Sequence, residues 1–136
     1  LHEMDEHGYC IVENMWSPLR AATVRAELAA ILASTPTGRN SFEGAKTRRI
    51  YALFAKTRSF DEAAIDPLVL GVVESLLETK HPLLSAPTGI CVGPGERAQP
   101  PHRDDGKYPL RRPHPELIMN TVGGVVWCGV LLCCVV

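Results

Sequence analysis

The sequence predicts an α+β fold, in which helical segments occupy the first half of the chain and short strands the second. Apolar residues recur at helical spacing in two segments, 18–33 and 67–77, and each segment follows a helix-start signal. From residue 83 onward, short apolar and β-branched runs are separated by glycine and proline, as is typical of strands. With 136 residues the chain fits one domain that can bury a hydrophobic core.

The first half is expected to contain a strand followed by a long helix. Residues 8–13 place aromatic and β-branched residues after a glycine, which predicts a short strand. Ser17 and Pro18 predict a helix start, because a serine oxygen accepts hydrogen bonds from free N–H groups of the first turn and proline suits the first helical position. The helical spacing continues to about Ala33, and Pro-Thr-Gly at 36–38 ends the helix.

A polar loop, a strand and a second helix are expected next. Residues 38–44 are bounded by glycines and predict a loop, and residues 47–54 predict a strand. Asp66 is placed to cap a helix that begins at Pro67 and extends to about Leu77.

The second half is expected to consist of short strands joined by turns. Residues 83–92 are strand-like but interrupted at Pro87, and Gly-Pro-Gly at 93–95 predicts a turn. Further strands are expected over residues 99–104 and from residue 117 to about 121.

The charge of the chain argues against two classes of partner. The formal net charge is −1, so nothing predicts binding to nucleic acid or to a membrane surface. Basic residues do gather in two places, where we expect a solvated rim; the alternative is that some of them attract an anionic co-substrate or an acidic substrate. The two groups are Lys46, Arg48 and Arg49, and Arg103, Lys107, Arg111 and Arg112.

The cysteines indicate a reducing compartment. The chain has 5 cysteines and no Cys-x-x-Cys pair, and Cys10 and Cys91 lie in apolar runs typical of small buried side chains. No secretory signal opens the sequence, so we expect a cytoplasmic protein. The first residue is Leu1 rather than methionine, and the N-terminus is therefore expected to be incomplete or processed.

The pattern that most directly indicates chemistry is His102-x-Asp104. If this segment is extended, residues two apart project to the same side, so the imidazole and the carboxylate converge while Arg103 turns away. An imidazole and a carboxylate are two of the three ligands in the 2-His-1-carboxylate site that binds non-haem Fe(II). The plain alternative is a loop histidine bonded to a neighbouring carboxylate, because so short a motif often occurs by chance.

A wider similarity surrounds this motif and extends from Asp5 to about Thr121. It is carried by the segments 6–14 (EHGYCIVEN), 84–90 and Gln99-x-x-His102-x-Asp104, with further similarity at residues 38–44 and 47–51. In these segments the sequence resembles the phytanoyl-CoA dioxygenase family of Fe(II)- and 2-oxoglutarate-dependent oxygenases.

The resemblance implies a fold, a reaction and a set of site residues. The fold would be a double-stranded β-helix (a cupin-like jelly roll) with N-terminal flanking helices. The reaction would be hydroxylation of a small organic or acyl-CoA-type substrate by O₂, with 2-oxoglutarate as co-substrate. His102 and Asp104 would bind Fe(II). Gln99 is assigned to cofactor binding, and an exposed loop glutamine is the alternative.

The last part of the sequence departs from the family. The resemblance implies a second histidine ligand and a 2-oxoglutarate-binding arginine further along, but no histidine follows His114. A jelly roll has about eight strands at a spacing of about 8–12 residues, so the chain after residue 83 has room for roughly half of them. We therefore expect a jelly roll that is incomplete at the C-terminus and a chain that is inactive as given. The alternative function is a non-catalytic fragment that acts as a binding or self-associating module.

Residues 122–136 are expected to form a separate apolar tail, because they contain no charge and no polar alternation. A transmembrane anchor is one interpretation, but the tail is shorter than the roughly 20 residues that span a bilayer. A buried pair of strands is a second. We favour a third, sequence foreign to the family such as a translated intron or a frameshift product. This divides the chain into a dioxygenase-like part, 1–121, and a tail, 122–136, that promotes self-association.

Four further residues need an interpretation. Asp105 is expected to form a turn before Gly106 rather than to bind metal. His114 lies between two prolines and is interpreted as a surface histidine, the alternative being a replacement third ligand. Arg49 and Tyr51 share one face of the strand predicted over 47–54, where they would line the pocket or serve the structure.

Overall fold

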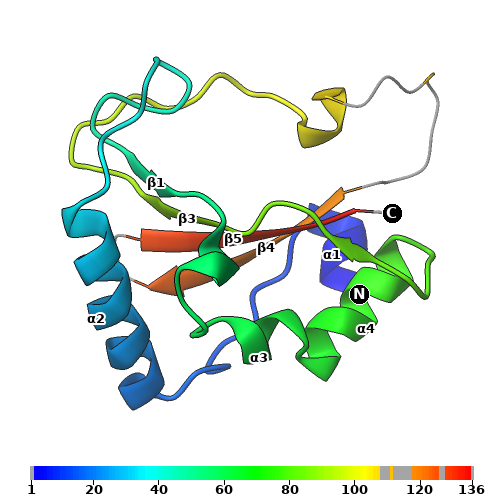
Figure 1. Ribbon diagram of the computed structural model, residues 1–136. Coiled ribbons are helices and arrows are strands. Elements are labelled where there is room, and N and C mark those ends of the chain that lie inside the picture. Colours follow the sequence, from blue (N-terminus) through cyan, green and yellow to red (C-terminus); the bar gives the residue numbers. More distant parts are fainter. Residues whose placement is uncertain (1, 108–110, 112–117, 126–127, 136) are drawn as a thin grey trace.

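The computed structural model describes residues 2–107, 111, 118–125 and 128–135 (Figure 1). Among these residues the α-helices lie before residue 77, and most of the strands follow. In order along the chain the elements are α1 (His2–His7), α2 (Pro18–Ala33), β1 (Arg48–Ile50), the 3₁₀ helix η1 (Leu53–Ala55), α3 (Asp61–Ala64), α4 (Pro67–Leu76), β2 (Leu83–Leu84), β3 (Thr88–Cys91), the 3₁₀ helix η2 (Asp104–Lys107), β4 (Ile118–Val125) and β5 (Cys128–Val135).

The five strands form one antiparallel sheet, and β5 lies in its middle. On one side of β5, β3 pairs with its first half and β2 with its end, whereas β4 pairs with it along the other side. β1 pairs with β3 and completes that side of the sheet. The mixture of helices with a small antiparallel sheet agrees with the predicted α+β class. The described strands make a single sheet, so the jelly roll stays a prediction.

The two long helices form where local signals predict them. The Ser17 side chain accepts a hydrogen bond from the backbone N–H of Arg20 at the start of α2, and proline holds the first helical position. At the start of α4, the Asp66 carboxylate accepts from the N–H groups of Leu68 and Val69. Because each cap uses residues next to the helix that it begins, both starts could be predicted without the rest of the fold.

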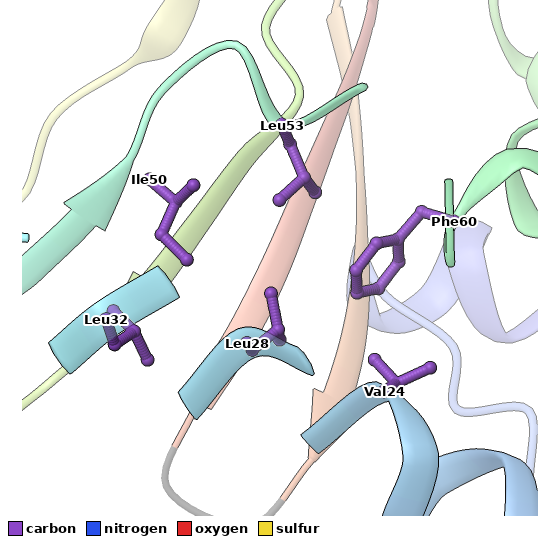
Figure 2. Close-up of a cluster of buried hydrophobic side chains, with 6 residues drawn as sticks. All are labelled: Val24, Leu28, Leu32, Ile50, Leu53 and Phe60. Carbon is purple, nitrogen blue, oxygen red and sulfur yellow. The ribbon is translucent and has the colours of Figure 1, made fainter. Parts of the chain in front are cut away.

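The hydrophobic core lies between α2 and the chain that follows β1. One face of α2 carries residues at spacings of four, and these side chains meet the last residue of β1, η1 and the segment before α3 (Figure 2). Burial of this face removes apolar surface from water and fixes α2 against the β1 side of the sheet. The buried residues of this cluster are Val24, Leu28, Leu32, Ile50, Leu53 and Phe60.

The strand predicted over residues 8–13 is wrong. The described structure instead begins with helix α1, which ends at His7, and residues 9–13 have no regular structure. Gly8 adopts φ +75°, the left-handed conformation that commonly ends a helix. The side chains of Tyr9, Ile11 and Val12 are largely exposed and the segment pairs with no described strand, so its β propensity has no partner to satisfy.

The strand predicted over residues 47–54 is shorter than expected. Regular pairing covers only β1, because Ala52 adopts a left-handed φ of 52° and starts η1. The interruption at Pro87 is confirmed, since it separates β2 from β3.

The described residues of the apolar tail form strands. β4 continues through Thr121 without a break, and its register with β5 extends from Ile118 opposite Val135 to Val125 opposite Cys128. This arrangement corresponds to the strand-pair interpretation. Within the described ranges, no helix combines the length and apolar character that crossing a membrane requires. The domain boundary at Thr121 and the foreign origin of the tail stay predictions.

The packing of α2 yields a test with a matched control. Leu28 is 2% exposed, so Leu28→Ala should lower the free energy of unfolding by about 2–5 kcal/mol. Leu19 lies on the same helix but is 79% exposed, and Leu19→Ala should change it by less than about 0.5 kcal/mol. Chemical denaturation measures both, and equal losses would contradict this placement of the core.

Candidate metal centre

His102 and Asp104 lie in a segment that is irregular rather than extended. The strand predicted over residues 99–104 is wrong: residues 99–103 form no helix or strand, and η2 begins at Asp104. Pro100 and Pro101 lack the N–H groups that a strand donates to its neighbour, which explains why this segment joins no sheet. The two side chains converge nevertheless, with His102 Nε2 3.5 Å from Asp104 Oδ1.

The backbone fixes which imidazole nitrogen faces Asp104. His102 Nδ1 lies 2.9 Å from the carbonyl oxygen of Pro100. A carbonyl oxygen only accepts hydrogen bonds, so Nδ1 carries the hydrogen and donates it. In the neutral ring the lone pair is then on Nε2, the atom that faces Asp104. Metal-binding histidines commonly have this arrangement, in which the second ring nitrogen donates to a carbonyl or a carboxylate.

The Asp104 carboxylate is held from the opposite direction by a residue of the sheet. Asn120 Nδ2, from β4, donates to Asp104 Oδ2 at 2.7 Å. This contact occupies one carboxylate oxygen and leaves the other, Oδ1, toward His102. Sequence reasoning missed Asn120, because an amide residue in a predicted strand carries no signal that it will meet a carboxylate from a distant loop.

The spacing of the two free atoms fits a divalent ion. Two ligand atoms at right angles, each about 2.1 Å from an ion, are about 3.0 Å apart. The observed 3.5 Å between Nε2 and Oδ1 requires only a small closure. The side chains are 40% and 34% exposed, so an ion has access from solvent. Across the part of the chain that the structure describes, no group of three histidine, cysteine or acidic side chains could hold a metal. The pair therefore supplies two ligands.

Asp105 and Arg103 bind each other rather than the pair. The Arg103 guanidinium donates from Nε and Nη2 to the two oxygens of Asp105, at 3.1 and 3.0 Å. The Asp105 side chain is only 7% exposed, and its oxygens are occupied by this bidentate contact. Asp105 lies within η2, and both residues line the same hollow as His102 and Asp104. His114 lies outside the described residues.

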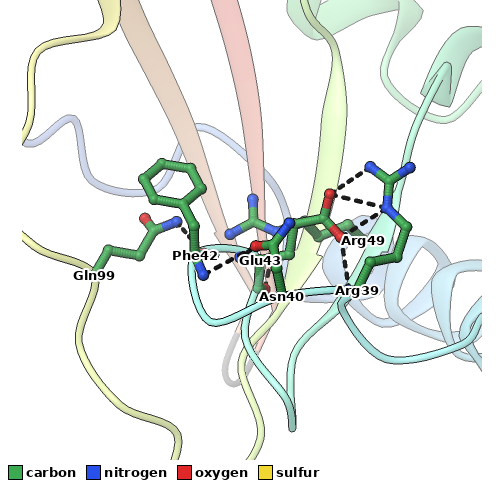
Figure 3. Close-up of polar contacts among 6 residues, drawn as sticks. All are labelled: Arg39, Asn40, Phe42, Glu43, Arg49 and Gln99. Carbon is green, nitrogen blue, oxygen red and sulfur yellow. Dashed lines mark hydrogen bonds and ion pairs between the residues drawn. The ribbon is translucent and has the colours of Figure 1, made fainter.

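Gln99 lies apart from the two candidate ligands. Its Nε2 donates to the backbone carbonyl of Phe42 at 2.6 Å, which ties the start of the segment to the loop 38–44 (Figure 3). It does not line the hollow at His102 and Asp104. Its assignment to cofactor binding stays a prediction, and the contact with Phe42 gives it a structural role.

A comparison of the sequence with known protein families gives a match. The profile of the phytanoyl-CoA dioxygenase (PhyH) family matches residues 4–131, most of the chain. The chain belongs to the phytanoyl-CoA dioxygenase family. Members of this family are oxygenases with a cupin-like fold that generally use Fe(II) and 2-oxoglutarate. The match passes the expected boundary at Thr121 and takes in β4 and the first part of β5. No curated protein matches the chain.

In this family member the two candidate ligands line an open hollow of about 440 Å³. Arg103 and Asp105 of the same segment, and Ile118 and Asn120 of β4, line the rest of it. A second, apolar groove of about 190 Å³ lies at Asn120 as well, between the N-terminal segment, α4 and β4. Asn120 is thus shared by both spaces. The groove is lined by Met4, Gly8, Tyr9, Cys10, Val12, Met15, Leu68, Val69, Val72, Met119 and Asn120, which include all 3 methionines of the chain and no charged residue.

Arg49 and Tyr51 line neither of these spaces. They border a separate hollow near the end of α2, together with Arg39, Glu43 and Lys56. The Nε of Arg49 donates to the backbone carbonyl of Glu43 at 3.1 Å. Of the two roles considered for Arg49, the structure shows a structural contact to the loop 38–44.

Glu43 forms an ion pair with Arg39 within the loop 38–44. Hydrogen bonds from the Arg39 side chain, and then from its backbone N–H, lower the pKa of the Glu43 carboxyl to about 2. The same ion pair raises the pKa of Arg39. The carboxylate therefore stays ionised, and the pair stays intact, throughout the neutral and mildly acidic range.

Arg39→Gln should return the pKa of Glu43 toward its ordinary value of 4.5. Since the folded-state pKa is depressed, the carboxylate stabilises the loop above about pH 4.5, and this contribution is lost as the pH falls toward 2. Titration of the side-chain carboxyl ¹³C resonance measures the shift. Arg48→Gln, which removes an equal charge from a residue that does not bond to Glu43, should leave it unchanged. Equal pKa values in wild type and Arg39→Gln would refute this cause.

Proposed function

We propose that His102 and Asp104 are two protein ligands of an Fe(II)- and 2-oxoglutarate-dependent oxygenase site that hydroxylates a small organic substrate. The observation that carries the proposal is the orientation of the pair: Nε2 and Oδ1 face each other at 3.5 Å while the remaining polar atom of each side chain is held by a hydrogen bond. Membership of an oxygenase family supports it independently.

The distance between the two side chains would not carry the proposal alone. His2 Nε2 and Glu6 Oε1 on helix α1 are also 3.5 Å apart. That pair is 83% and 54% exposed and stands one helical turn apart, as surface ion pairs commonly do. What distinguishes His102 and Asp104 is that the Pro100 carbonyl and the Asn120 amide fix the orientation of both groups.

Each neighbouring group has a definite task in such a site. When bound, Fe(II) with 2-oxoglutarate and O₂ supplies the oxidising power for hydroxylation of a C–H bond. The Pro100 carbonyl keeps the hydrogen of His102 on Nδ1, so that Nε2 is free to bind metal. Asn120 keeps the Asp104 carboxylate from rotating, and the open hollow leaves room beside the pair for small ligands.

The apolar groove supports a small organic substrate with an uncharged part. Its lining has no charged side chain, and methionines supply adaptable apolar contacts. Because Asn120 borders both the groove and the hollow, a substrate in the groove would reach toward the side of Asp104.

Two ligands bind an ion more weakly than three. Since no group of three histidine, cysteine or acidic side chains among the described residues could hold a metal, we expect weak metal binding and a chain that is inactive on its own. The first test is therefore metal binding rather than turnover.

Mn²⁺, a redox-stable substitute for Fe(II), should bind wild-type protein at one site, as measured by electron paramagnetic resonance of the free ion. His102→Ala and Asp104→Ala should each weaken binding by at least about tenfold, because each removes a ligand. His2→Ala is the matched control and should leave the affinity unchanged, although it breaks a pair with the same separation. If His2→Ala has as large an effect as His102→Ala, or wild type does not bind Mn²⁺, the proposal is wrong.

The alternative, a self-associating module, rests on a different observation. Within the described strands β4 pairs only with β5, so its other edge offers unpaired backbone groups over 8 residues. The sequence from 122 to 136 adds no charge that would oppose pairing with another chain. This edge would let two copies join through β4.

Sedimentation velocity over a hundredfold range of protein concentration tests this alternative. Self-association through an open edge should shift the population from monomer to dimer or larger species as the concentration rises. Addition of Mn²⁺ should not change that distribution, because β4 presents its edge whether or not metal is bound. A monomer at every concentration would contradict the alternative.

A further inference from the structure

The loop 38–44 contacts the candidate ligand His102 through an aromatic ring. The Phe42 ring and the His102 imidazole have centroids 5.0 Å apart and planes inclined by 66°. This edge-to-face arrangement is favourable for aromatic rings and restricts the orientation of both. Nothing in the metal-binding motif itself predicts the contact, because Phe42 lies before β1, far from His102 in the sequence.

Hydrogen bonds within the loop hold Phe42 in place. The side-chain oxygen of Asn40 accepts from the backbone N–H of Phe42 at 3.0 Å and from that of Glu43 at 2.9 Å. The N–H of Gly44 returns to the carbonyl of Asn40 at 3.0 Å, which closes the turn. The ion pair between Arg39 and Glu43 spans the same residues (Figure 3). The loop is therefore fixed by its own side chains.

The loop is also attached to the sheet. Arg49 of β1 reaches the Glu43 carbonyl with its Nε (Figure 3). The N–H of Gly38 donates to the carbonyl of Thr47 at 2.9 Å, next to the start of β1. These two contacts fix the position of Phe42, at the tip of the loop, relative to β1.

Phe42 contacts both ends of the metal-binding segment. Its carbonyl accepts from Gln99 Nε2 at 2.6 Å, and its ring meets His102. The segment between them contains Pro100, whose carbonyl binds His102 Nδ1. Phe42 therefore contacts Gln99 and His102, the residues on either side of the Pro100 carbonyl that orients the imidazole.

We infer that Phe42 is a positioning residue for His102, and that it keeps the imidazole in the orientation with Nδ1 on Pro100 and Nε2 toward Asp104. The two candidate ligands are then held by different parts of the fold: His102 by the loop 38–44, and Asp104 by Asn120 of β4. The importance of Phe42 for metal binding rests on the proposed function, whereas the orientation of the imidazole can be measured without metal.

The first experiment measures the histidine tautomers of metal-free protein by ¹⁵N NMR. Wild-type His102 should carry its hydrogen on Nδ1. Phe42→Leu removes the ring and should raise the proportion of the Nε2–H form about three- to tenfold, the range expected for loss of an aromatic pair. Phe42→Tyr keeps the ring and should preserve the wild-type ratio.

Tyr9→Leu is the matched control. Tyr9 also lies beside a histidine, with its ring centroid 6.2 Å from that of His7, but it has no contact with the metal-binding segment in the described structure. This variant should leave the tautomers of His102 unchanged. An unchanged ratio in Phe42→Leu, or an equal change in Tyr9→Leu, would overturn the inference.

The second experiment measures Mn²⁺ affinity of the same variants. Phe42→Leu should weaken Mn²⁺ binding about three- to tenfold, and Phe42→Tyr should bind Mn²⁺ with the wild-type affinity. If wild type binds no Mn²⁺, the proposed function fails, but the tautomer ratios still decide the role of Phe42. If wild type binds Mn²⁺ and Phe42→Leu binds equally well with unchanged tautomers, only the positioning role fails.

Gln99→Glu provides an independent variant should Phe42→Leu not fold. It keeps the side-chain shape but replaces the donor to the Phe42 carbonyl by an acceptor, so the start of the segment loses its attachment. The His102 tautomer ratio should change in the same direction as in Phe42→Leu. A wild-type ratio in Gln99→Glu would then count against the role of Phe42.

Discussion

The hydrogen bond from Asn120 to Asp104 is the contact on which the candidate site depends. The segment 99–104 joins no strand, so its side chains cannot inherit their positions from a sheet. Asn120 provides that link, because it belongs to β4 and β4 is paired with the central strand β5 along its length. Without this hydrogen bond, the Asp104 carboxylate would lose the contact that turns Oδ1 toward His102. The geometry of the pair is thus a consequence of sheet pairing, transmitted through one amide.

A second, separate support reaches His102 through the other half of the chain. The face of α2 that packs on Ile50 fixes β1, and β1 holds the loop 38–44 through Arg49. Phe42 at the tip of this loop meets the imidazole. The β1 side of the sheet therefore orients His102, and β4 orients Asp104. To hold two side chains in one geometry at a metal site, distant parts of the fold must agree in this way.

Features with local causes could be predicted from the sequence, and features with distant causes could not. The starts of α2 and α4 follow from the caps Ser17 and Asp66, and the break between β2 and β3 follows from Pro87. The residue patterns of 8–13 and 99–104 predict strands that do not form, because pattern alone does not reveal whether a partner strand exists. The convergence of His102 with Asp104 was expected for an extended chain and occurs instead at the entry to a 3₁₀ helix. The contacts of Asn120 and Phe42 have no local signal at all.

The measurement that tests the central claim most directly is a map of Mn²⁺-induced paramagnetic broadening over the backbone amide resonances of wild-type protein. The account predicts that broadening is greatest at His102 to Asp104 and at Asn120, and that it extends to Phe42, because these residues surround the two free ligand atoms. Broadening centred on His2 and Glu6, or spread over many surface carboxylates without a maximum at His102, would contradict the claim that this pair is the metal site.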